Sequence, residues 1–183
     1  EYLAVEGDFI NYDDFNKNFR LIKPASFNFA YDVVDRLGRE DPDRCALVWT
    51  NPEGDVVTYN FRRMMEDSNR AANYFTSLGV KKGDAVMLIL KRHHEFWPAI
   101  IALHKIGAVT IPATHLLTAK DIRYRVQAAD VSVIVATEHT SVVCNAIDEA
   151  APDCPTLRHK VVVRSKRPGW ESYDEGFAAA SVE

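Results

Sequence analysis

Histidine, cysteine and serine are residue types whose spacing can mark a metal site or a nucleophile, and we examined their spacing first. His93 and His94 are adjacent, so on a helix they point about 100° apart and cannot bind one metal as a pair four residues apart would. Cys144 and Cys154 have no histidine or cysteine at metal spacing, and no serine stands in a G-x-S-x-G elbow. The sequence therefore predicts no metal ligand and no catalytic residue.

A glycine-rich loop that would hold phosphates is also missing from the sequence. The eight glycines are never closer than four positions apart, and each fits a helix end or a turn. Neither the dinucleotide-binding fingerprint nor the Walker loop can be assembled from them. Phosphate binding therefore cannot be assigned to a motif in this chain.

Composition and charge exclude several classes of partner. The 183 residues are 47% hydrophobic and 26% charged, with a net charge of −4. This balance gives no electrostatic reason to expect nucleic acid or an anionic membrane as partner. The three cysteines are odd in number and widely spaced, as in a reducing compartment, and no apolar run reaches the roughly 20 residues of a membrane span. We therefore expect a cytoplasmic protein without a membrane span.

The elements that would position a site are clearest between Gly83 and Pro112. A short apolar run bounded by charged residues predicts a strand buried on both faces at 84–90. Apolar residues at helical spacing predict a helix at 95–106, and a second strand follows at 108–111. Such a strand–helix–strand unit is typical of a parallel sheet.

Cap and turn residues mark the ends of further elements. Asn60 and the pair Thr118 and Asp121 have the side chains of helix N-caps, whereas Gly38 and Gly107 are expected to end helices. The remaining elements that we expect are helices at 28–37, 60–78, 118–129 and 141–150, strands at 131–136 and 160–163, and a hairpin of strands 45–50 and 56–59.

These elements predict an α/β fold: a doubly wound, mainly parallel sheet with helices on both faces, plus an N-terminal hairpin. We divide the chain into a lead-in segment with a short helix at 1–25, an α/β subdomain at 26–165 and a connector at 166–183. Nothing in the polar stretch from Arg164 to Ser181 is expected to join the core.

An ordered series of motifs resembles the N-terminal part of AMP-forming acyl-CoA synthetases, a branch of the adenylate-forming superfamily. The resemblance covers about residues 10–165 and is most similar to the short- and medium-chain acyl-CoA branch. The motifs that carry it are Phe27-Asn28-Phe29-Ala30, Val57-Thr58-Tyr59, Ser68 to Asn73, Gly79 to Asp84, Leu103 to Pro112, Ala113 to Leu117 and Asp121 to Arg125.

The resemblance implies an ATP-dependent ligase that works in two steps. A carboxylate attacks the α-phosphate of ATP to give an acyl-adenylate and pyrophosphate, and the thiolate of coenzyme A (CoA) then displaces AMP. ATP, CoA and Mg²⁺ are the implied cofactors and a short- or medium-chain carboxylic acid the implied substrate. The family's phosphate loop, later aromatic and acidic motifs and C-terminal lysine are not in this sequence, so the resemblance implies no catalytic residue here.

The resemblance also implies part of a CoA site in two loops. By position these are Thr114, His115 and Leu116 after the second core motif, and Thr137, Glu138 and His139 after the next strand. Relatives in the acetyl-CoA branch use an arginine of the second loop to bind the nucleotide phosphate, whereas this chain has Ser141 near that position. These residues are thus either CoA contacts or ordinary loop and capping residues.

We expect the chain to be an N-terminal piece of a synthetase, because it begins at Glu1 without methionine and ends before the phosphate loop would be expected. Such a piece would not adenylate an acid by itself, and its cut sheet would leave apolar surface that favours self-association. Two alternatives stay open, a self-standing nucleotide-binding or flavodoxin-like module and a non-catalytic interaction domain. The sequence beyond Glu183 would separate the three.

Overall fold

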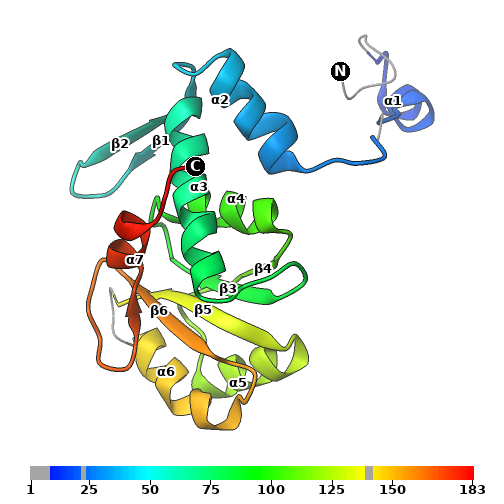
Figure 1. Ribbon diagram of the computed structural model, residues 1–183. Coiled ribbons are helices and arrows are strands. Elements are labelled where there is room, and N and C mark those ends of the chain that lie inside the picture. The colour runs from blue at the N-terminus through cyan, green and yellow to red at the C-terminus, as the bar shows by residue number, and fades with distance from the viewer. Residues whose placement is uncertain (1–8, 22–23, 139–141) are drawn as a thin grey trace.

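The structure is a computed structural model, and it describes residues 9–21, 24–138 and 142–183. Its centre is a five-stranded sheet in the order β4-β3-β5-β6-β7, in which every neighbouring pair is parallel (Figure 1). The expected doubly wound parallel sheet is confirmed. The strands are β3 Ala85–Ile89, β4 Val109–Pro112, β5 Val131–Thr137, β6 His159–Val163 and β7 Glu171–Ser172.

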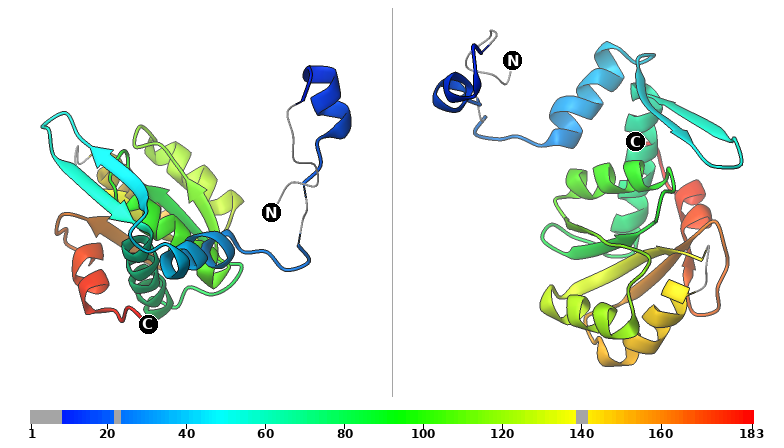
Figure 2. Two further views of the ribbon diagram at one scale, coloured as in Figure 1. Left: turned by 90° about the horizontal axis from the view of Figure 1, so that it is seen from above. Right: turned by 180° about the vertical axis from the view of Figure 1, so that it is seen from behind.

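Helices cover both faces of this sheet, because side chains alternate along each strand and both sets are apolar. On β3, Val86 and Leu88 pack with α3, α4 and α7, whereas Met87 and Ile89 pack with α5 and α6. Figures 1 and 2 show these two helical layers on opposite sides of the strands. The helices are α3 Phe61–Ser77, α4 Phe96–Ile106, α5 Ala119–Ala128, α6 Val142–Ala150 and α7 Tyr173–Ala179, with a 3₁₀ turn η2 at Ala151–Asp153.

Three of the four predicted helix ends are confirmed. The side chain of Asn60 accepts a hydrogen bond from the Arg63 N–H, and Thr118 and Asp121 form a reciprocal capping box. Gly107 ends α4 at φ 71°, in the left-handed region that glycine adopts without strain. Local chemistry therefore decides these boundaries.

The predicted stop at Gly38 is wrong. A π-helical segment, η1 Ala30–Asp35, runs directly into α2 Arg36–Glu40, so Gly38 lies inside the helix. A Cβ atom at Gly38 would lie 3.0 Å from Cβ and Sδ of Met65, and glycine is therefore there to let α2 approach α3.

The predicted hairpin is confirmed as a separate antiparallel pair, β1 Cys45–Thr50 and β2 Val56–Asn60. It lies beside α3, and its residue Tyr59 packs with Met64 of α3 and Ile101 of α4 (Figure 2). The hairpin thus borders one end of the large sheet.

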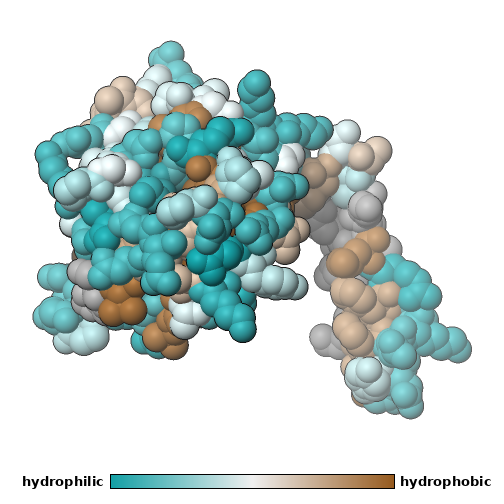
Figure 3. Space-filling view, turned by 90° about the horizontal axis from the view of Figure 1, so that it is seen from below, coloured by the Kyte–Doolittle hydropathy of each residue, from teal (hydrophilic) through white to brown (hydrophobic). Residues whose placement is uncertain are grey.

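The short helix expected in the lead-in segment is α1 Tyr12–Asn18, and it has no buried residue. Its aromatic rings contact one another, with Phe15 and Phe19 stacked at 4.7 Å between centroids. Figures 1 and 3 show α1 apart from the body of the molecule, and the face in Figure 3 is mostly hydrophilic with small separate apolar patches. No helix in the described part of the chain is long and apolar enough to cross a membrane.

The expectation that nothing after Arg164 joins the core is wrong. Glu171–Ser172 extends the sheet as β7, and Tyr173, only 2% exposed, packs on Tyr74 and Phe75 of α3. The sequence hid this because the stretch is polar and carries only one large residue that becomes buried. The division of the chain at residues 25 and 165 stays a prediction.

Candidate functional site

The carboxyl ends of the parallel strands form the edge at which doubly wound sheets bind ligands. From β3 the chain moves to β4 on one side and then returns past β3 to β5 on the other. The strand order therefore reverses between β3 and β5. A crevice at such a switch point is the expected place for a ligand.

His93 and Thr137 meet at this switch point. His93 Nε2 and Thr137 Oγ1 are 2.7 Å apart, and they join the loop after β3 to the end of β5. Thr137 is 3% exposed, and its carbonyl accepts a hydrogen bond from the Cys144 thiol at 3.4 Å. Burial raises the pKa of Cys144 to about 11, so this thiol stays protonated near neutral pH. Thr137 is therefore a buried residue that links the β3–α4 loop to α6 at the carboxyl edge of the sheet.

Glu138 is held by the segment that follows β6. Its carboxylate accepts hydrogen bonds from Arg167 Nη1 at 2.7 Å and from Ser165 Oγ at 3.0 Å. The same Arg167 binds Asp148 of α6 through Nη2, also at 2.7 Å. Glu138 is thus neutralised by protein groups, and a ligand would contact it only beside Arg167.

The other predicted loop lies on the opposite side of β3. Leu116 is 75% exposed and its N–H is hydrogen-bonded to Thr114 Oγ1 at 3.3 Å, whereas Leu117 is buried and anchors the loop. His115, between Thr114 and Leu116, is partly exposed. Both predicted loops therefore lie at the carboxyl edge of the sheet, on either side of β3. The predicted residue His139 lies outside the described residues.

A second cluster at this edge was not predicted from the sequence. His94 Nδ1 is hydrogen-bonded to the Tyr59 hydroxyl at 2.8 Å, and Glu95 accepts from Arg164 Nε at 2.6 Å. Burial lowers the pKa of His94, with a smaller opposing effect of Glu95, and burial raises that of Tyr59 to about 12. The only signal in the sequence was the position of the two histidines directly after a buried strand.

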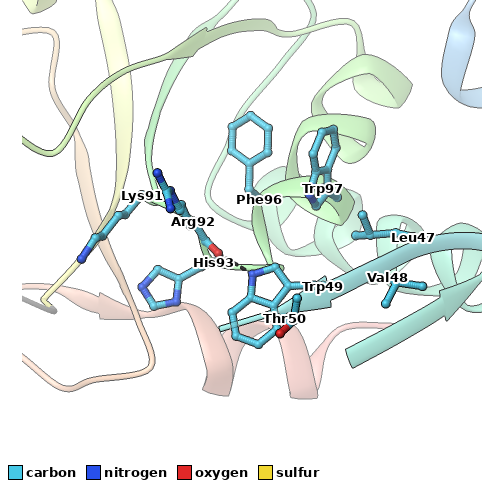
Figure 4. A pocket seen from close by; sticks show the side chains of 9 residues that line it. All are labelled: Leu47, Val48, Trp49, Thr50, Lys91, Arg92, His93, Phe96 and Trp97. Carbon is cyan, nitrogen blue, oxygen red and sulfur yellow. Dashed lines mark hydrogen bonds between the residues drawn. The ribbon is translucent and has the colours of Figure 1, made fainter. Parts of the chain in front are cut away.

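A cavity of about 470 Å³ opens between β1 and the loop from β3 to α4 (Figure 4). The side chains of Trp49, Phe96 and Trp97 bring three aromatic rings to it, and Lys91 and Arg92 bring two positive charges. Cavities of this size with apolar walls and a few charged groups are typical ligand sites. The sequence did not predict it, because the hairpin and this loop meet only in the folded chain.

Comparison with known proteins decides the family. Residues 34–182 match the model of the AMP-binding enzyme family. This chain belongs to the AMP-binding enzymes. The resemblance seen in the sequence motifs is confirmed.

Among curated AMP-binding enzymes, the chain is 39% identical over 180 residues to the mitochondrial acyl-coenzyme A synthetase ACSM4 of Rattus norvegicus, covering 93% of this chain and 30% of the relative. It is 35% identical to mitochondrial ACSM3 of Pongo abelii, covering 97% and 31%. The chain therefore spans about 30% of the length of these relatives.

Solved structures share the fold of this AMP-binding chain. The acyl-CoA synthetase of Brucella canis superposes with a TM-score of 0.73 at 21% identity, over 87% of this chain and 28% of that protein. The anthranilate CoA ligase AuaEII, in complex with anthranoyl-AMP, has a TM-score of 0.73 at 22% identity, over 88% and 30%.

The expectation of a cytoplasmic protein is wrong, because these relatives are mitochondrial synthetases. The cysteine count indicated only reducing surroundings, and neither cysteine count nor net charge determines which compartment of the cell a protein occupies.

Proposed function

We propose that this chain is the N-terminal α/β part of an AMP-forming acyl-CoA synthetase that acts on short- or medium-chain carboxylic acids in mitochondria. Its similarity to mitochondrial acyl-CoA synthetases over nearly its whole length is the observation that carries the proposal. The reaction is the two-step one of the family, acyl-adenylate formation from acid and ATP followed by transfer of the acyl group to CoA.

The residues of this chain do not fit the triphosphate of ATP. In the described part, the glycines with positive φ stand singly in turns or at helix ends, at Gly54, Gly79, Gly83, Gly107 and Gly169. They do not place consecutive backbone N–H groups around a phosphate, as a cradle requires. We therefore derive no adenylation step from this chain and assign it the role of scaffold and of one wall of the CoA site.

Thr114, His115 and Leu116 are the residues that we propose for CoA, with Thr137 and Glu138 supporting the same edge. The first three are the more accessible, since Thr137 is buried and Glu138 is paired with Arg167. His115 offers a ring nitrogen for a hydrogen bond to the cofactor.

The test is ATP–pyrophosphate exchange with a series of short and medium acids, measured on this chain and on a chain with the full length of its relatives. We expect no exchange from the 183 residues alone and acid-dependent exchange from the longer chain. Exchange by the short chain, or none by a folded long chain with any acid of the series, would contradict the proposal.

A further inference from the structure

The cavity between β1 and the β3–α4 loop combines aromatic walls with positive charge. Its lining contains Trp49, Phe96, Trp97, Lys91 and Arg92, and no acidic residue. In Figure 4 the aromatic and basic side chains come from two separate segments, with Lys91 and Arg92 to the left of the three aromatic rings. A ligand that fits both features carries a flat ring and a negative charge.

The walls of this cavity are held in place by other contacts. The indole N–H of Trp49 donates to the Arg92 carbonyl at 2.5 Å, which ties the hairpin to the loop. The guanidinium of Arg164 lies 5.6 Å from the centroid of the Trp49 ring. His93, also in the lining, is hydrogen-bonded to Thr137 at the switch point. Trp49 and the backbone of the loop are therefore already ordered before a ligand binds, which lowers that part of the entropic cost of binding.

The positive charges at the cavity are not neutralised by the protein. In the described part of the chain, neither Lys91 nor Arg92 forms a side-chain ion pair, and both side chains are exposed. The nearest carboxylate in the sequence, Glu95, is already paired with Arg164 at 2.6 Å. An incoming anion would therefore find two available cationic donors.

We propose that this cavity binds the 3′-phosphorylated adenosine end of CoA, an inference that rests on the proposed function. The adenine ring packs against Trp49 and Trp97, and the phosphate is bound by Lys91 and Arg92. Exposed side-chain cations suit the end of a cofactor that takes no part in the reaction, whereas the reacting phosphates of ATP need a fixed backbone cradle. The cavity lies at the same carboxyl edge as the loop that carries His115.

Tryptophan fluorescence can test binding in this chain without any catalysis. The three tryptophans are Trp49, Trp97 and Trp170, and the variant Trp170→Phe leaves only the two that line the cavity. Titrations with adenosine 3′,5′-bisphosphate, adenosine and inorganic phosphate would separate the ring from the charge. We expect saturable quenching with the bisphosphate, and affinity for adenosine at least about tenfold weaker.

Arg92→Ala should weaken binding of the bisphosphate about tenfold. Arg158→Ala is the matched control, because Arg158 pairs with Asp84 at the opposite end of β3 and should leave binding unchanged. Equal affinity for adenosine and the bisphosphate, or equal affinity in Arg92→Ala and the parent chain, would overturn the proposal.

A third measurement keeps this proposal separate from the proposed function. ATP–pyrophosphate exchange by the longer chain requires no CoA, so Arg92→Ala should leave it unchanged while raising KM for CoA. Absent exchange with normal nucleotide quenching would contradict the synthetase assignment alone, and normal exchange with an unchanged KM would contradict the cavity assignment alone.

Discussion

The ammonium of Lys105 donates a hydrogen bond to Oδ1 of Asn69 at 2.6 Å, and this contact sets the direction of the Asn69 amide. An ammonium can only donate, so the oxygen must face it and the amide nitrogen must face the other way. That nitrogen donates to the carbonyl of Val182 at 2.9 Å. Because Lys105 also pairs with Asp35 at 2.7 Å, one chain of contacts links η1 to the C-terminal residues.

Side chains of α3 bind four successive carbonyls in this C-terminal segment. Besides Asn69, Arg70 donates to the Ala180 carbonyl at 3.0 Å, and Asn73 donates to those of Ser181 and Glu183 at 3.0 and 2.7 Å. These bonds involve only the backbone of residues 180–183. Backbone hydrogen bonds therefore contribute to the docking of the segment on α3, beside the packing of Ala180 on the core.

We predict that Asn69→Asp loosens the docking of residues 180–183 around Val182 while the rest of the fold persists. The aspartate keeps an oxygen for Lys105 but turns a second oxygen toward the Val182 carbonyl, so that a donor becomes a repelling acceptor. The heteronuclear NOE of the backbone amides at 180–182 should fall. Asn145→Asp on α6, where Oδ1 accepts from Arg167, is the control and should leave these values unchanged.

Lys105→Met should destabilise the fold by about 3–5 kcal/mol, because it leaves Asp35 buried without its partner. The two side chains are only 2% and 6% exposed. Urea unfolding measures the loss. Lys160→Met removes a more exposed ion pair with Asp148 and should cost about 1 kcal/mol or less, so equal losses in the two variants would contradict the role given to burial.

Gly176→Ala should destabilise the docking of α7 on α3, although alanine favours helix formation. A Cβ atom at Gly176 would lie 2.0 Å from Cε2 of Tyr74, so α7 or the ring must move. Overpacking of this kind costs about 1–3 kcal/mol. In a Tyr74→Leu background the same substitution should cost much less, and a cost that is equal in both backgrounds would rule out this contact as the cause.

The stability of the protein should fall as the pH drops below about 6.5, in part because of His94. Burial lowers the pKa of His94 in the folded chain below its usual 6.5, so the unfolded chain binds the proton first and unfolding becomes easier. Below the lowered pKa the effect is constant. Urea unfolding between pH 7.5 and 5 should show a weaker pH dependence in His94→Gln than in the parent chain, and an equal dependence in the two would contradict the role given to His94.

In a chain with the full length of its relatives, His115→Ala should raise KM for CoA several-fold and leave ATP–pyrophosphate exchange unchanged. The reason is that CoA enters only the second step of the proposed reaction. The control Lys120→Ala changes a residue of α5 beyond the loop and should leave both values unchanged. An unchanged KM for CoA in His115→Ala would show that His115 does not contact CoA and that its loop has only a structural role.

Much of the fold was predicted from the sequence because its determinants are local. The Thr118–Asp121 capping box and the left-handed Gly107 depend on neighbouring residues only. Gly38 was misjudged because the reason for a glycine there is Met65, 27 positions along the chain. Tyr173 was missed because a single aromatic residue in a polar stretch gives no periodic signal.

The sequence by itself determined the strand and helix order, the parallel sheet and the family, since periodic burial and ordered motifs are written along the chain. Only the tertiary structure decided the contacts between distant segments: His93 with Thr137, Lys105 with Asp35 and Asn69, and the cavity between the hairpin and the β3–α4 loop. The physical reason is that polar and aromatic side chains pair only when they are close in space. For residues on different elements, their separation along the sequence does not determine that distance.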